Sequence, residues 1–203
     1  MIIEYCKQQD NFFDILPAKN FLPQWYTCIK NDENINAKMC MPFLDSFLTG
    51  YIVQSSYDID VENGNVVSKN VAIREPKTIQ TPTGYFEKEY MWSFLYNIKI
   101  ENNYSILITH PLNRYDLPFI TLSGIVDVDD IMVHGSLTFF IKNGFSGKIV
   151  AGTPVAQLIP IKRESWELFY NNNLKEIGKN RYLKSSFTKN LYRNNFWHRK
   201  EYK

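Results

Sequence analysis

Two stretches of this 203-residue chain decide its fold: Gly124-Ile-Val-Asp-Val-Asp-Asp130 and Gly152-Thr-Pro-Val-Ala-Gln-Leu-Ile159. Each begins at a glycine and continues into β-branched or aliphatic residues, which is the pattern of a strand that follows a tight turn. Between them lies Ser136-Leu-Thr-Phe-Phe-Ile-Lys142, followed by the turn signal Asn143-Gly144. We therefore expect antiparallel β structure throughout this region.

The same pattern extends over residues 41–161. A run from Tyr51 to Val61 ends at Glu62-Asn-Gly-Asn65, a strong signal for a tight turn, so a hairpin with residues 66–73 is expected. Further strands are predicted at 96–100, 104–110, 119–128 and 155–161. Many short strands with Gly and Asn turns predict an all-β barrel or sandwich. Short helices are expected at 42–48, where Gly50 lies just past the end, and at 165–171.

The two glycine-entered stretches resemble the heart of the dUTPase family. There, a G-[VI]-[IV]-D-x-D-Y turn is followed by strands and then by G-x-R-x-A-Q-L-I, in the order found here. The resemblance implies a dUTPase-like distorted barrel over 45–161, which assembles as a homotrimer. On this view residues 1–44 are an N-terminal arm rich in Pro and aromatic residues, and residues 162–203 are a basic, aromatic, partly helical tail.

A second resemblance concerns the whole chain and a family of tailed-phage and bacterial proteins. Its hallmarks here include Pro23-Gln-Trp-Tyr26, Cys40-Met-Pro-Phe-Leu-Asp-Ser46 and Thr109-His-Pro-Leu-Asn-Arg114. This resemblance implies a phage or bacterial origin and no particular chemistry.

The sequence departs from the dUTPase pattern where that family touches its nucleotide. Asp127 and Asp129 match the two acidic positions, but Asp130 stands where the family has the aromatic residue beneath the sugar. Pro111-Leu-Asn-Arg114 replaces the phosphate-binding P-R-S-G, and Pro154 replaces an arginine. Phosphate needs cations, backbone amides or Mg²⁺ to offset its charge. The pattern indicates a retained scaffold whose catalytic site has been lost.

The candidate ligand-binding residues are Asp127, Asp129, Arg114 and Gln157. No catalytic residue is predicted; if the protein is an enzyme, Asp127 orients the attacking water. The carboxylates from 127 to 130 suit Mg²⁺ or Ca²⁺, but we favour a solvated turn and predict no metal site, with Mg²⁺ as cofactor only if nucleotides are hydrolysed.

Other reactive side chains favour structural interpretations. His110 and His134 each precede Pro or Gly at a strand end, where hydrogen-bonded turn residues are commoner than metal ligands. Cys40 lies between two methionines, which favours a buried, inert thiol. The three cysteines are widely spaced, which suggests a reducing compartment.

Charge is distributed unevenly along the chain. Residues 162–203 hold 11 Lys/Arg against 4 Asp/Glu, whereas residues 1–161 hold 12 against 17, within a net charge of +2. Basic and aromatic residues alternate over 181–203, which suits nucleic acid or an arm that wraps an acidic neighbouring subunit, and we favour the arm. No stretch is apolar enough to span a membrane, and the N-terminal residues predict no secretion signal.

These observations predict a non-catalytic assembly or binding protein on a dUTPase-like trimeric scaffold. It is expected to be phage-encoded, to act in the host cytoplasm or the virion, and to bind copies of itself and other phage proteins. Two alternatives stay open: a nucleotide hydrolase related to dUTPases and dCTP deaminases with a remodelled pocket, and a sponge that binds nucleotides without changing them.

Overall fold

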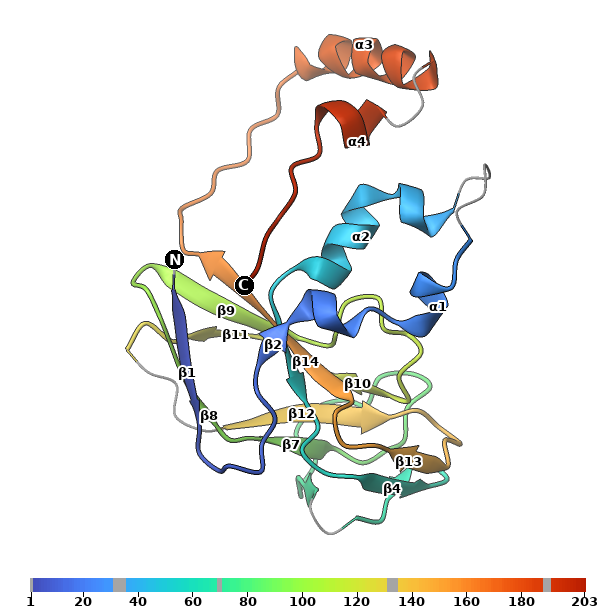
Figure 1. Ribbon diagram of the computed structural model, residues 1–203, viewed down its shortest axis with the longest axis vertical. Coiled ribbons are helices and arrows are strands. Elements are labelled where there is room, and N and C mark those ends of the chain that lie inside the picture. The colour runs from blue at the N-terminus through green and yellow to red at the C-terminus, as the bar shows by residue number, and fades with distance from the viewer. Residues whose placement is uncertain (1, 31–35, 69–70, 131–134, 188–190) are drawn as a thin grey trace.

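The computed structural model describes residues 1–203 except 1, 31–35, 69–70, 131–134 and 188–190 (Figure 1). Strands dominate the described residues, which confirms the predicted all-β class. The strands are β1 (Ile3–Lys7), β2 (Leu16–Pro17), β3 (Tyr51–Gln54), β4 (Ile59–Glu62), β5 (Asn65–Val66), β6 (Ala72–Ile73), β7 (Tyr90–Phe94), β8 (Tyr96–Ile100), β9 (Tyr104–Thr109), β10 (Phe119–Thr121), β11 (Gly124–Asp127), β12 (Gly135–Ile141), β13 (Gly147–Ile149) and β14 (Pro154–Lys162). The helices are η1 (Ala18–Phe21), α1 (Gln24–Thr27), η2 (Ala37–Met39), α2 (Met41–Leu48), α3 (Leu174–Phe187) and α4 (Leu191–Asn195).

Four antiparallel sheets enclose one aromatic core. The largest has the order β11-β9-β14-β3-β2, and the next has the order β10-β12-β7-β6. β13-β4-β5 and β1-β8 form the two smaller sheets. Between the sheets Trp92 stacks on Phe139 with ring centroids 3.7 Å apart. The Trp92 indole donates to Thr121 Oγ1 (3.0 Å), and the Thr121 hydroxyl donates to the Val155 carbonyl (2.6 Å). The buried indole N–H and the buried hydroxyl therefore both have hydrogen-bond partners.

The predicted strands at 96–100, 104–110, 136–142 and 155–161 are confirmed, whereas the runs 51–61 and 119–128 are each divided into two strands that belong to different sheets. The Asn63-Gly64 turn joins β4 to β5, and both of its residues have positive φ, as a two-residue hairpin turn requires. The strand predicted over 66–73 is wrong in its extent, because β5 ends at Val66 and β6 pairs with β7 rather than with β4. A turn motif fixes where a hairpin bends, but its strand length depends on the partners available in the sheet.

Of the two predicted helices, the first is confirmed and the second is wrong. α2 ends at Leu48, and Gly50 (φ +71°) turns the chain into β3. A Cβ at Gly50 would lie 2.1 Å from the Leu158 carbonyl oxygen, so only glycine fits there. Residues 165–171 are extended, and the helix begins at Leu174 instead. A seven-residue helix is too short to be stable in water without a surface to pack on.

The described residues of the N-terminal segment, 2–30 and 36–44, pack on the folded body. β1 pairs with β8 and β2 pairs with β3. Tyr26 of α1 packs on Phe47 of α2, with ring centroids 4.9 Å apart. The segment therefore packs on its own domain rather than forming a free extended arm, and the boundary suggested at residues 44/45 lies within α2.

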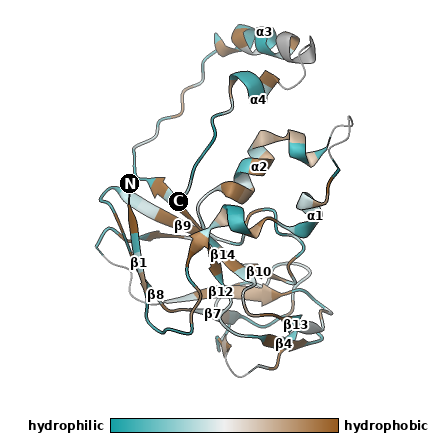
Figure 2. Ribbon diagram, viewed as in Figure 1, coloured by the Kyte–Doolittle hydropathy of each residue, from teal (hydrophilic) through white to brown (hydrophobic). Residues whose placement is uncertain are grey.

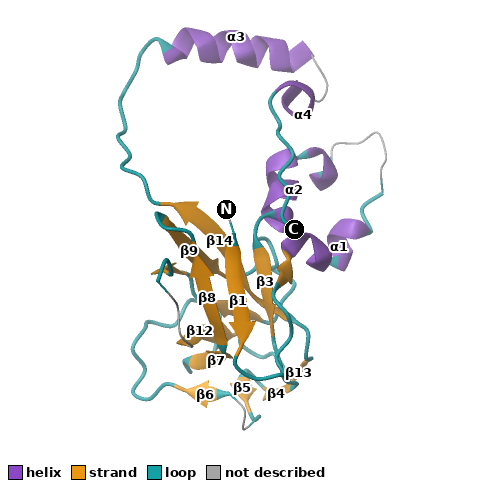
Figure 3. Cartoon of the chain, turned by 60° about the vertical axis from the view of Figure 1, so that its left-hand side comes forward, coloured by secondary structure: helices purple, strands orange, loops and turns teal. Residues whose placement is uncertain are grey.

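The tail leaves the body and returns to it. It runs outward from β14, forms α3 and α4 away from the sheets, and then descends so that its last residues lie beside β2 and β14 (Figures 1 and 3). The hydropathy colouring mixes polar and apolar residues around α3 without a continuous apolar stripe (Figure 2). Within the described part of the chain, no helix combines the length and apolar character needed to cross a membrane.

Candidate functional site

The Gly-Ile-Val-Asp motif forms β11, at the edge of the five-stranded sheet. β11 pairs with β9 so that Asp127 lies opposite Ser105. The Ser105 hydroxyl donates to Asp127 Oδ1 at 2.5 Å. This bond fixes one carboxylate oxygen, while the side chain as a whole stays 65% exposed. Asp127 is thus an oriented, accessible carboxylate, as the motif predicted.

Arg163, which sequence reasoning missed, neutralises the two aspartates. It directly follows β14, and its backbone N–H donates to the Asn103 carbonyl (2.7 Å), which brings its side chain to the end of β9. Its guanidinium lies 3.2 Å from Asp127 Oδ1 and binds Asp129 through a second nitrogen. Both carboxylates are therefore paired with a guanidinium from another part of the chain.

The electrostatics of this cluster keep both aspartates charged. The hydrogen bond from Ser105, followed by the one from Arg163, lowers the pKa of Asp127 below its ordinary value. The hydrogen bond from Arg163 does the same for the pKa of Asp129. Asp130 is exposed beside them. A side chain that accepts hydrogen bonds in its ionised form stays ionised to lower pH.

An open hollow lies next to the cluster. It is lined by Ser105, Ile125, Ile161, Lys162, Arg163, Glu164, Ser165 and Trp166. Both of its cations are already paired, Lys162 with Glu164 and Arg163 with the two aspartates. A polyphosphate entering the hollow would have to compete with these carboxylates for every positive charge that lines it.

Arg114 and Gln157 lie at the opposite end of β9 from Asp127. Gln157 pairs with Thr109 and Asp127 with Ser105, so about four residues of strand, or about 13 Å, separate the two levels. Gln157 contacts the turn that precedes Arg114, because the Leu112 N–H donates to Gln157 Oε1 (2.8 Å). The four predicted site residues thus form two separate pairs within one chain.

Both members of the second pair are engaged in contacts that hold the fold. Arg114 forms an ion pair with Asp116 (2.9 Å) and donates to the Phe21 carbonyl (3.2 Å). Gln157 is 2% exposed, and its Nε2 donates to the carbonyls of Ser46 (3.0 Å) and Thr49 (2.5 Å). It therefore joins β14 to the end of α2.

His110 is the hydrogen-bonded turn residue that the sequence indicated. Its Nδ1 accepts from the Thr121 N–H (3.3 Å), so Nε2 carries the hydrogen and donates to the Arg114 carbonyl (3.2 Å). Burial lowers the pKa of His110 below its ordinary value of 6.5. His134 lies outside the described residues.

The remaining reactive groups form no site. Cys40 is exposed, which contradicts the expected buried thiol, because it lies at the junction of η2 and α2 and its side chain faces outward. Among the residues that the structure describes, no three His, Cys, Asp or Glu side chains are arranged to hold a metal ion.

Comparison with known proteins gives matches among solved structures alone. No protein-family model and no curated protein matches the sequence. The dUTPase of EIAV is similar over 84% of this chain and 98% of its own, with 16% identity and a TM-score of 0.40. The similarity to the dUTPase from phage phi11 of S. aureus covers 85% of this chain and 97% of that protein, with 12% identity and a TM-score of 0.42. The similarity to the Staphylococcus bacteriophage 80alpha dUTPase covers 84% of this chain and 96% of that protein, with 11% identity and a TM-score of 0.42.

The described fold is all-β, as the strand pattern predicted, and these dUTPases are proteins to which the chain is similar. The glycines themselves differ in their roles. Gly152 has φ +87°, which suits the turn before β14, whereas Gly124 begins β11 with open space around it and no positive φ. At Gly124, neither the backbone conformation nor the surrounding space requires glycine. The similarity concerns the fold, so the activity has to be inferred from this chain's own residues.

Proposed function

We propose that the protein is a non-catalytic assembly or binding protein on a dUTPase-like trimeric scaffold. It is phage-encoded, it acts in the host cytoplasm or the virion, and it works through contacts with copies of itself and other phage proteins. One observation carries the proposal: the tail presents large apolar side chains to water along its whole outward course.

Eight large apolar residues between 166 and 183 are each more than half exposed. They are Trp166, Leu168, Phe169, Tyr170, Leu174, Ile177, Tyr182 and Leu183. Fully burying one such side chain stabilises a protein by about 1.5–3 kcal/mol. Large apolar side chains that are concentrated in one exposed segment are typical of surfaces that bind a partner. The segment is therefore suited to bind another protein surface.

The Asp127 cluster supports a role without catalysis. Asp127 and Asp129 are held by Arg163, and Lys162 is held by Glu164. Arg114, another candidate ligand-binding residue, pairs with Asp116 at the far end of β9. A nucleoside triphosphate in the hollow would find carboxylates in excess and no unpaired cation among the hollow's lining residues.

The solution mass tests the proposal. We expect the wild-type chain to be oligomeric by light scattering coupled to gel filtration. The variant carrying Trp166→Ser, Leu168→Ser and Phe169→Ser is expected to lose that association while keeping the circular dichroism spectrum of the folded wild type. Tyr115→Ser is the matched control, because Tyr115 is an aromatic residue of the body with 77% exposure. A wild-type chain that is monomeric at all concentrations, and that recovers no partner from phage particles, contradicts the proposal.

The hydrolase alternative rests on Asp127. Its carboxylate is oriented by Ser105, ionised and 65% exposed, so it could orient a water molecule once a substrate displaces Arg163. Incubation with deoxynucleoside triphosphates and Mg²⁺ distinguishes the two functions. Release of phosphate or pyrophosphate that Asp127→Asn abolishes supports the hydrolase. A thermal shift with nucleotides and no release supports the sponge, and neither response is expected of an assembly protein.

Nucleic acid binding by residues 181–203 is not favoured. The Trp197 indole and the Lys200 ammonium both bind Asp45, and the Arg181 guanidinium lies over the Phe196 ring, 5.1 Å from its centroid. Part of the basic, aromatic surface is thus already occupied within the chain.

A further inference from the structure

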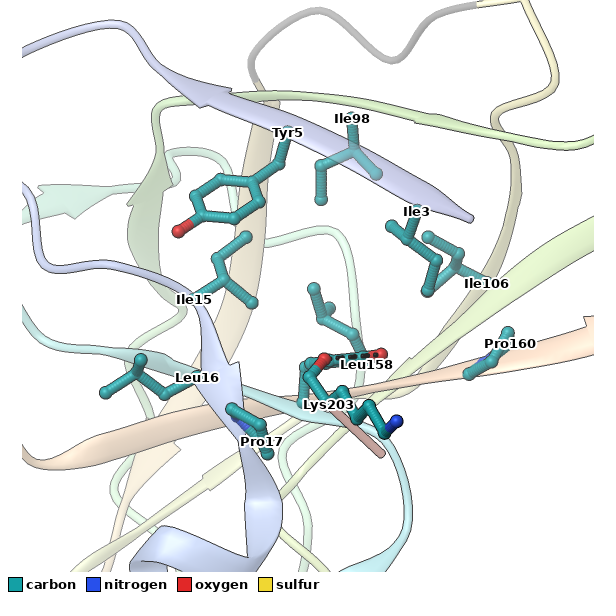
Figure 4. Close-up of a pocket in the computed structure, with 11 residues that line it drawn as sticks. Ile3, Tyr5, Ile15, Leu16, Pro17, Ile98, Ile106, Leu158, Pro160 and Lys203 are labelled. Carbon is teal, nitrogen blue, oxygen red and sulfur yellow. Dashed lines mark hydrogen bonds between the residues drawn. The ribbon is translucent and has the colours of Figure 1, made fainter. Parts of the chain in front are cut away.

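An apolar cavity of about 280 Å³ lies beneath the end of the tail (Figure 4). Its aliphatic walls come from four strands and include Ile3, Ile98, Ile106 and Leu158. For comparison, an engineered cavity of about 150 Å³ with similar walls stays free of water and binds benzene. A space of nearly twice that volume fits two fused rings rather than one.

Rigid rings line another part of the cavity. The rings of Tyr5 and Tyr51 line the cavity together with Pro17 and Pro160 (Figure 4). The two tyrosine rings present planar faces against which an aromatic ligand can pack, and the two prolines add rigid apolar surface. Shape and chemistry therefore point to the same class of ligand.

The tail closes this region through a polar anchor on α2. Asp45 accepts from the Trp197 indole N–H (3.0 Å) and pairs with the Lys200 ammonium (2.6 Å), and its side chain is 13% exposed. Beyond the anchor, Tyr202 packs edge-on against Tyr51, with ring centroids 6.0 Å apart, and Lys203 forms part of the cavity wall. The anchor thus holds one wall of the cavity in place.

We propose that this cavity binds a small fused-ring aromatic compound and that residues 196–203 form its lid, held by Asp45. This site is distinct from the Asp127 cluster and is independent of the assembly role, because none of the residues that line it belongs to the 166–183 segment. The two proposals can therefore fail separately.

The probe is 5-fluoroindole, followed by ¹⁹F NMR on the full chain. A ligand of about ten heavy atoms is expected to bind with a Kd of about 1 mM or tighter. Ile3→Phe, which places a ring inside the cavity, is expected to weaken binding at least about tenfold. Ile2→Phe is the matched control, because Ile2 is the neighbouring residue, does not line the cavity and is 68% exposed.

Leu16→Phe enlarges another lining residue that is 38% exposed, and it keeps the test valid if Ile3→Phe folds poorly. Binding that both substitutions leave unchanged overturns the proposal, and so does the absence of saturable binding by the wild type. If the two substitutions alter the solution mass but not the binding of the probe, the cavity is an interface between copies of the chain, and the proposal is likewise overturned.

The lid is tested through its anchor. Asp45→Asn removes the ion pair with Lys200 and weakens the bond from Trp197, so we expect faster exchange of the fluorinated probe and faster amide hydrogen exchange over 196–203. Asp10→Asn, at an exposed position of the N-terminal segment, is the control. Unchanged exchange rates in Asp45→Asn show that these residues are not a lid.

Discussion

Replacing Glu89 by Gln is expected to destabilise the protein strongly, because Glu89 is a buried carboxylate that organises a whole loop. Its side chain is 0% exposed. Its oxygens accept from the Thr78 N–H (2.8 Å), the Thr78 hydroxyl (3.1 Å) and the Ile79 N–H (3.2 Å). The Arg74 guanidinium lies 3.1 Å from Oε1. Each of these groups donates a hydrogen bond to the carboxylate or, in the case of Arg74, carries a positive charge beside it.

The magnitude follows from these contacts. An amide keeps one acceptor oxygen but turns an NH₂ toward groups that are themselves donors, so about half of the contacts are lost. A hydrogen bond to a charged group contributes about 1.5–3 kcal/mol, and removing one partner of a buried ion pair costs about 3–5 kcal/mol. We therefore expect Glu89→Gln to lower the free energy of unfolding by about 3 kcal/mol. For a chain of this length the melting temperature falls by roughly 6–12 °C.

The assay is urea unfolding followed by circular dichroism, at neutral pH and again in acid. Burial raises the pKa of Glu89. The hydrogen bonds from Thr78 and Ile79 and the charge of Arg74 together lower it by more than burial raises it, so the net pKa is below 4.5. A lowered carboxyl pKa contributes stability that is fully present above pH 4.5 and is lost as the pH falls through the folded-state pKa. The difference between wild type and variant should therefore shrink in acid.

Glu87→Gln is the matched control. Glu87 lies two residues away in the same loop, pairs with Lys77 at 2.6 Å and is 79% exposed, so its substitution should leave the unfolding curve unchanged. Equal destabilisation by the two substitutions, or a Glu89→Gln difference that does not vary with pH, would refute the account of Glu89 given above.

Three further predictions concern the junctions around β14. Gly50→Ala should prevent folding or cost more than about 4 kcal/mol, because its Cβ would meet the Leu158 carbonyl at 2.1 Å; Gly124→Ala, with open space around it, should be neutral by the same thermal melt. Gln157→Glu should lower the free energy of unfolding by about 2–4 kcal/mol, since a carboxylate would face two carbonyls, whereas equal stability in urea contradicts this role. His110 should stay neutral in the fold, so stability falls as the pH drops below 6.5 toward its folded-state pKa; an NMR titration that gives a folded pKa of 6.5 or higher would contradict this.

The sequence predicted the parts of the fold that depend on local backbone geometry. Asn63-Gly64 and Gly50 occupy positions with positive φ, a requirement that a few neighbouring residues express. It did not predict where β5 ends or that residues 165–171 are extended, because those outcomes depend on which surfaces are available to pair or pack with. Local signals fix turns, whereas the lengths of strands and short helices depend on the tertiary structure.

The candidate site could be predicted only in part for the same reason. Asp127 and Asp129 were found because they belong to one short motif. The partner that sets their charge, Arg163, is 34 residues from Asp129 in sequence and reaches it because β14 pairs with β9. Arg114, by contrast, was predicted to bind a ligand although its carboxylate partner Asp116 lies only two residues further on.

Arg163 also connects the site to the tail. It follows β14 directly, and three residues later Trp166 begins the exposed apolar segment. A partner that buries Trp166 must therefore settle within a few residues of the guanidinium that holds Asp127 and Asp129. Any displacement of Arg163 by such a partner would free two oriented carboxylates at the edge of the sheet. If the partner displaces Arg163, occupation of the tail changes the charge of the Asp127 cluster, so the nucleotide assay should be run on a sample whose assembly state is known.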